Sequence, residues 1–151
     1  MHKTLFIYII VIFSLTACKP PVEAIQVIDK PQCLKSQSRC DIKTNIGIFT
    51  LRFNVKEVKV EIPFTMQIAY IGKESIQKIN GYMEGKNMFM GKIPLFFKKM
   101  LINNQFSAET MLVACTEPNM VWRTWIHVEY KMKNQQKLFK QRFFVDFSSR
   151  Y

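Results

Sequence analysis

Histidine and glycine are scarce in this chain of 151 residues, and their scarcity excludes several kinds of active site. Only two histidines are present, and His127 is the one that lies beyond the first 17 residues. The sequence therefore offers no hydrolytic triad and no zinc site built on several histidines, and its five glycines form no phosphate-binding loop. Acidic residues are scattered singly, which disfavours chemistry that needs paired carboxylates. We therefore predict a protein that is not an enzyme.

Acidic residues are also few, with 11 of them against 22 basic residues and a formal net charge of +11. Most of the basic residues are lysine rather than arginine. Arginine is better suited to bidentate recognition of phosphate, so this balance argues against a nucleic-acid-binding protein. The positive charge either forms a solvated surface, which is the simpler interpretation, or holds the domain near anionic lipid headgroups.

Long apolar segments are absent as well. The longest run, residues 5–13, is nine residues long, whereas a membrane-spanning helix needs about 20. Basic residues before this run and small residues after it are typical of a secretory signal. The following segment, Leu15–Cys18, resembles the lipobox of bacterial lipoproteins, in which the cysteine is acylated and becomes the first residue. The resemblance implies a signal peptide over residues 1–17 and a membrane anchor on Cys18. The alternatives are an ordinary secretory signal or a membrane-anchored N-terminus.

The residues after Cys18 predict a tether, and Lys19 bears on the membrane in which the protein is anchored. Residues 18–32 contain three prolines and no sustained period, which is typical of a stiffened spacer. Lys19 follows the anchor cysteine, and a residue other than aspartate at this position resembles the pattern of lipoproteins that are sorted to the outer membrane. We therefore expect the protein to be anchored in a membrane facing the periplasm, the outer membrane rather than the inner one.

Three cysteines remain beyond the anchor: Cys33, Cys40 and Cys115. An exported protein reaches a compartment that permits disulfides. Cys33 and Cys40 are separated by a short polar stretch, and closing so short a loop costs little entropy. We predict a Cys33–Cys40 disulfide, which leaves Cys115 as the odd thiol.

From about residue 47 onward, apolar and polar residues alternate, as in half-buried β-strands. In residues 58–70 every even position is apolar, and Pro63 falls on the outward phase, which predicts an edge strand or a bulge. About seven strands are predicted, over residues 49–53, 58–70, 76–84, 88–98, 106–115, 122–131 and 139–147. This pattern predicts an all-β, immunoglobulin-like β-sandwich over residues 33–151. A small open β-barrel is the alternative.

Methionine and cysteine supply the candidate metal ligands. Met88 and Met90 are two residues apart, so in a strand both thioethers leave the same face. Cys115 and Met120 flank a four-residue segment that looks like a hairpin loop, in which they would lie opposite each other. Such soft sulfur ligands select Cu(I) over calcium, magnesium or manganese. The alternative is that these residues only pack in the core, because methionine and cysteine are common there.

Two segments carry a further resemblance. Residues 83–91 and 115–122 are similar to E-G-x-x-M-x-M-G and C-x4-M-x-W segments of small uncharacterised proteobacterial envelope proteins. Those proteins resemble the YtkA-like and FixH-like periplasmic sandwiches associated with copper supply and oxidase assembly. The resemblance implies an immunoglobulin-like domain and a link to copper, with Met88, Met90, Cys115 and Met120 as candidate ligands. The chain lacks the histidines that many periplasmic copper carriers use beside methionine, and this departure from their pattern favours Cu(I) over Cu(II).

These observations lead to one leading hypothesis and one competitor. The leading hypothesis is a membrane-anchored envelope lipoprotein that binds or delivers Cu(I) to a protein client, serving respiratory oxidase assembly. Glu84 would be an orienting charge beside the four sulfur ligands. The competitor is a structural or protein-interaction lipoprotein without a metal, in which the methionines and Cys115 pack or form an apolar patch.

Overall fold

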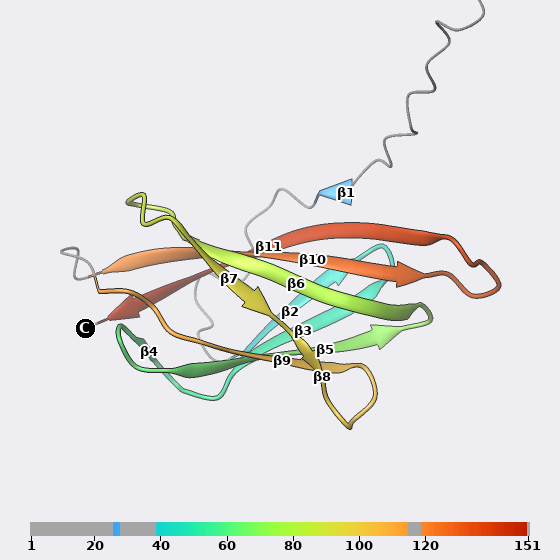
Figure 1. Ribbon diagram of the computed structural model, residues 1–151, viewed down its shortest axis with the longest axis horizontal. Coiled ribbons are helices and arrows are strands. Elements are labelled where there is room, and N and C mark those ends of the chain that lie inside the picture. The colour runs from blue at the N-terminus through green and yellow to red at the C-terminus, as the bar shows by residue number, and fades with distance from the viewer. Residues whose placement is uncertain (1–25, 28–38, 115–118, 151) are drawn as a thin grey trace, which may run out of the picture.

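The computed structural model describes residues 26–27, 39–114 and 119–150. These residues form two β-sheets and no helix, and the sheets pack face to face (Figure 1). The strands are β1 (Gln26–Val27), β2 (Arg39–Thr44), β3 (Gly47–Phe53), β4 (Val58–Lys59), β5 (Phe64–Gly72), β6 (Ser75–Gly85), β7 (Lys92–Phe96), β8 (Lys98–Lys99), β9 (Gln105–Thr110), β10 (Met120–Lys131) and β11 (Leu138–Arg150).

The strand order within each sheet is that of an immunoglobulin-like sandwich. One sheet has the order β2-β3-β5-β9-β8, and the other has the order β1-β11-β10-β6-β7 with β4 also beside β11. β3, β5 and β9 take the places of strands A, B and E, and β6, β7, β10 and β11 take those of C, C′, F and G. The predicted all-β sandwich is confirmed. The described residues contain more strands than the seven expected, because β2 adds an edge strand and β1, β4 and β8 are two-residue pairings.

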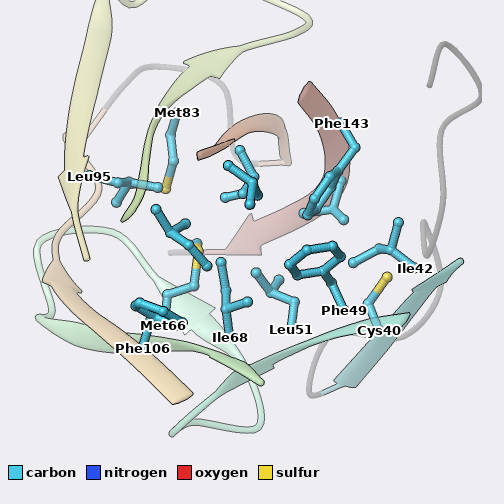
Figure 2. Close-up of a cluster of buried hydrophobic side chains, with 14 of the residues drawn as sticks. Cys40, Ile42, Phe49, Leu51, Met66, Ile68, Met83, Leu95, Phe106 and Phe143 are labelled. Atoms are coloured by element: carbon cyan, nitrogen blue, oxygen red, sulfur yellow. The ribbon is translucent and has the colours of Figure 1, made fainter. Parts of the chain in front are cut away.

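The core lies between the inner faces of the two sheets and is filled by apolar residues of the inward phase (Figure 2). Phe49 of β3 is fully buried. Its ring centroid lies 4.8 Å from that of Tyr70 in the same sheet and 5.0 Å from that of Phe143 in the opposite sheet. Trp122 is also fully buried, and its Nε1 donates a hydrogen bond of 3.0 Å to Ser149 Oγ. Aromatic contacts therefore join the two sheets, and the buried indole keeps a partner for its N–H group.

The strand predicted over residues 58–70 is interrupted in the structure. β4 ends at Lys59, Glu61 has a positive φ of 58°, and β5 begins at Phe64. β5 lies between β3 and β9, so it is a central strand. Because proline has no N–H to donate, Pro63 lies in the turn before this strand and not within it. The expected edge strand or bulge at Pro63 is therefore wrong, while the inward phase of the residues that follow is confirmed.

Candidate functional site

Two of the candidate ligands meet at Gly85, at the end of β6. Gly85 pairs with Trp122 of β10, two residues after Met120, and Lys86 N donates a 2.8 Å hydrogen bond to Val121 O. A Cβ atom built on Gly85 would lie 2.8 Å from Met120 Cε and 3.3 Å from Met90 Cγ. It would also collide with the carbonyl oxygen of Met88. The missing side chain of Gly85 is therefore the space into which both thioether side chains pack.

The methionines around Gly85 differ widely in exposure. Met120 is buried, with 1% of its surface exposed, and Met90 is partly buried against the core. Met88 is 39% exposed, and its neighbour Phe89 is 89% exposed. The cluster therefore runs from the core to the tip of the loop between β6 and β7, and one thioether is accessible from solvent.

One geometric expectation about the ligands is wrong. The strand expected over residues 88–98 begins only at Lys92, and Met88 and Met90 lie in the loop before it, where Gly91 has a φ of 72°. Cys115, one flank of the predicted hairpin, lies outside the described residues, so its pairing with Met120 stays a prediction; the strands on either side, β9 and β10, belong to different sheets. The chain crosses from one sheet to the other between them. Alternation alone does not distinguish such a crossing from a hairpin.

The predictions that concern cysteine stay largely untested, because the structure describes one of the four cysteines. Cys18, Cys33 and Cys115 lie outside the described residues, so the lipid anchor, the disulfide and the fourth sulfur ligand stay predictions. Cys40 lies on β2 and is buried in the core, with 4% of its surface exposed. Its position is compatible with a structural role.

Glu84 is directed away from the methionines. It pairs with Arg123 on the outward phase of β6 and β10, whereas Gly85 pairs with the inward-facing Trp122. Its Oε1 accepts a 2.7 Å hydrogen bond from Trp125 Nε1. The carboxylate of Glu84 therefore orients a tryptophan on the outer face of the sheet.

A buried ion-pair network lies beside Gly85 on that outer face. The carboxylate of Asp146 is completely buried and accepts hydrogen bonds from Arg123 Nε at 2.8 Å and Nη2 at 2.9 Å. It also accepts a 3.1 Å hydrogen bond from Lys86 Nζ. Burial alone would raise the pKa of Asp146, but the hydrogen bonds and charges of Arg123 and Lys86 outweigh it and lower the pKa below its usual value. The network ties the start of the β6–β7 loop to β10 and β11.

Stacked cations and aromatic rings cover this network. The Arg123 guanidinium carbon lies 3.9 Å from the ring centroid of Phe144, and that of Arg142 lies 4.7 Å from the ring of Trp125. The rings of Trp125 and Phe144 are 4.9 Å apart. Sequence reasoning missed the whole network, because Asp146 sits on the outward phase of its strand, where a carboxylate is expected to face water.

His127 lies on the outward phase of β10, but its ring is not freely solvated. Its Nε2 is buried and has no hydrogen-bond partner. Burial, and then the charges of Arg142 and Lys92, lower the pKa of His127 below its usual value of 6.5. The imidazole is therefore neutral at neutral pH.

Residues 39–114 and 119–150 contain neither a cluster of histidine, cysteine and carboxylate side chains nor a membrane-spanning helix. Within these ranges no three or more histidine, cysteine, aspartate or glutamate side chains are grouped so as to hold a metal ion. In the same part of the chain no helix is long and apolar enough to cross a membrane.

No protein-family model matches the chain, and no curated protein sequence matches it. Among solved structures, the chain is similar to a DUF4785 family protein from Legionella pneumophila subsp. pneumophila str. Philadelphia 1, with a TM-score of 0.54 and 14% sequence identity. The similarity covers 71% of this chain and 29% of the Legionella chain. At this identity the likeness concerns the fold alone, and it agrees with the β-sandwich described above.

Proposed function

We propose that the chain is a lipid-anchored lipoprotein of the bacterial cell envelope that binds Cu(I) and hands it to a protein client, without catalysing a reaction. The approach of both Met90 and Met120 to the same space at Gly85 is the observation that supports it most. Two side chains that are 30 positions apart bring thioether groups to one end of one sheet. Met88 and Cys115 would complete the set of sulfur ligands, and oxidase assembly is the process that we propose the copper serves.

The chemistry of these residues suits a monovalent soft ion. Thioether and thiolate sulfur bind Cu(I) in preference to the hard divalent cations, which require oxygen ligands. Placing an uncompensated charge beside a buried side chain such as Met120 is costly. A thiolate from Cys115 would neutralise Cu(I), so the pair would add no net charge to this end of the sandwich. The exposed Met88 would give the ion a way in and out.

A second candidate function has support from the same place. Met120 is almost completely buried and contacts Gly85 as a core residue would, which agrees with a packing role. The exposed Phe89 at the loop tip would then be a contact for a protein partner. In this case the protein is a structural or interaction lipoprotein that binds no metal.

A competition titration separates the two functions. The chain from residue 19 onward is titrated with Cu(I) against a chromophoric chelator, together with the variants Met90→Leu, Met120→Leu and Cys115→Ser. We expect the parent to compete and each variant to lose at least about tenfold in affinity, since each removes one sulfur ligand. Met66→Leu is the matched control, because Met66 is equally buried but lies on β5 of the other sheet. No competition by the parent, or equal affinity in all variants, would leave the metal-free function.

The anchor is tested separately. Mass spectrometry of the membrane-extracted protein should find acyl chains on an N-terminal Cys18, and Cys18→Ser should leave the membrane fraction. Counting thiols on the unreduced protein should find one, because Cys33 and Cys40 are predicted to be paired. Three thiols, or a Cys18→Ser variant that stays in the membrane fraction, would contradict the corresponding prediction.

A further inference from the structure

The turn between β8 and β9 carries two exposed apolar side chains in neighbouring positions. Leu101 is fully exposed, and Ile102 is 59% exposed. We refer to these two residues as the apolar tip. The turn projects beyond the edge of the sandwich (Figure 1).

Backbone hydrogen bonds hold the turn in this form. Met100 N donates to Gln105 O at 2.8 Å across the base of the turn, and Asn104 has the positive φ of 58° that closes it. Asn104 O accepts a 2.9 Å hydrogen bond from Tyr70 N of the neighbouring β5. The apolar tip is therefore preorganised outside the core and attached firmly to the sheet.

The surroundings of the tip combine apolar and basic side chains. Ile71, at the end of β5 next to the turn, is 69% exposed, and it pairs with Ile48 of β3, which is 37% exposed. Four exposed lysines belong to the same end of this sheet or to its connections: Lys43, Lys73, Lys98 and Lys99. Of the acidic residues there, Glu74 is partly buried, and Asp41 forms an ion pair with Arg39 at 3.2 Å.

We propose that the apolar tip inserts into the surface of an anionic lipid bilayer, with these lysines at the level of the headgroups. An apolar apex flanked by lysines matches the two layers of a bilayer surface, because the apolar groups enter the acyl region while the ammonium groups stay with the phosphates. The excess of basic residues in the chain complements an anionic membrane. The inference depends neither on the lipid at Cys18 nor on copper binding.

Tryptophan fluorescence tests this inference on the full chain. Leu101→Trp is mixed with or reconstituted into vesicles containing brominated acyl chains, either anionic (phosphatidylglycerol) or zwitterionic (phosphatidylcholine). The matched control is Ile62→Trp, since Ile62 is 52% exposed but precedes β5, at the end opposite to the tip. The parent, with Trp122 and Trp125, supplies the baseline, and circular dichroism checks that each variant is folded.

We expect the added tryptophan at position 101 to shift to shorter wavelength and to be quenched in anionic vesicles, while the tryptophan at position 62 is not. Adding Lys98→Gln and Lys99→Gln should weaken insertion by roughly twenty-fivefold, because each lysine near an anionic surface contributes roughly fivefold. Absence of quenching at position 101, or equal quenching in zwitterionic vesicles, would overturn the proposal. A blue shift without vesicles that grows with protein concentration would also overturn it, in favour of a second copy of the chain as the partner.

Discussion

Replacing Asp146 by asparagine should destabilise the protein strongly, although Asp146 lies on the outward phase of its strand. The substitution keeps the shape of the side chain but removes the charge that faces Arg123 and Lys86. The Asp146 carboxylate is completely buried, and the side chains of Arg123 and Lys86 are 24% and 41% exposed. Breaking a buried ion pair costs roughly 3–5 kcal/mol. Because both cations keep some contact with water, we expect the lower end, about 3 kcal/mol, in the free energy of unfolding.

Urea denaturation followed by tryptophan fluorescence measures this loss. The matched control is Glu57→Gln, which removes an exposed ion pair with Arg150, where the Nε–Oε1 distance is 3.3 Å and the side chains are 43% and 71% exposed. An exposed pair is worth at most about 1 kcal/mol. If Asp146→Asn loses no more stability than Glu57→Gln, the assignment of a stabilising buried network is refuted.

The pH dependence of the same variant gives a second check. The pKa of Asp146 is lowered in the folded protein, so its stabilising contribution is present above the unfolded value of about 3.8. The contribution is lost as the pH falls through the lower, folded value. The difference in stability between the parent and Asp146→Asn should therefore be constant near neutral pH and shrink below about pH 4. A difference that stays constant down to acidic pH would contradict the lowered pKa.

Two further substitutions test the surroundings of the candidate site. Gly85→Ala should lower the free energy of unfolding by about 1–3 kcal/mol through overpacking, and it should weaken Cu(I) binding in the chelator titration. Gly91→Ala is the control: the added methyl group meets no atom within 4 Å, so this variant loses stability only through its φ of 72°. Equal Cu(I) affinity in the two variants would argue against a site at Gly85. His127→Gln should make the free energy of unfolding less dependent on pH between pH 7 and pH 5. Because the pKa of His127 is lowered in the folded protein, only the unfolded chain takes up a proton near pH 6.5, and the stability of the parent therefore falls below that pH. An unchanged slope in urea titrations across this range would show that His127 is not responsible.

Alternation predicts the inner faces of this sandwich well, because a half-buried strand must place apolar residues at every second position. Phe49, Leu51 and Ile126, which lie on the apolar phase of predicted strands, are buried. The same rule misses β2, whose inward positions include only two apolar side chains, Cys40 and Ile42, between charged neighbours. It also does not reveal which strands pair, because pairing depends on contacts between residues far apart in the sequence.

The candidate site could be predicted only in part. Residue chemistry selected the methionines, and the structure brings Met90 and Met120 together, but through the space at Gly85 and not through a shared strand or a hairpin. Asp146 could not be found in this way. Asp146 is buried because long side chains from a neighbouring strand, such as Arg123, cover it on the outer face of the sheet. The residues next to Asp146 in the sequence do not indicate this burial.

The two proposed surfaces lie at opposite ends of the sandwich, and this arrangement has a functional consequence. β6 runs from Ser75, just after the end of β5 that adjoins the apolar tip, to Gly85, where Met90 and Met120 meet. Eleven residues of extended strand span about 35 Å. If the apolar tip rests on a bilayer, the methionine end points away from the lipid, toward proteins that approach from the aqueous side. The solvent-accessible Met88 would then be available for copper exchange while the domain stays on the membrane, so vesicle binding should leave the rate of Cu(I) transfer to a soluble chelator unchanged.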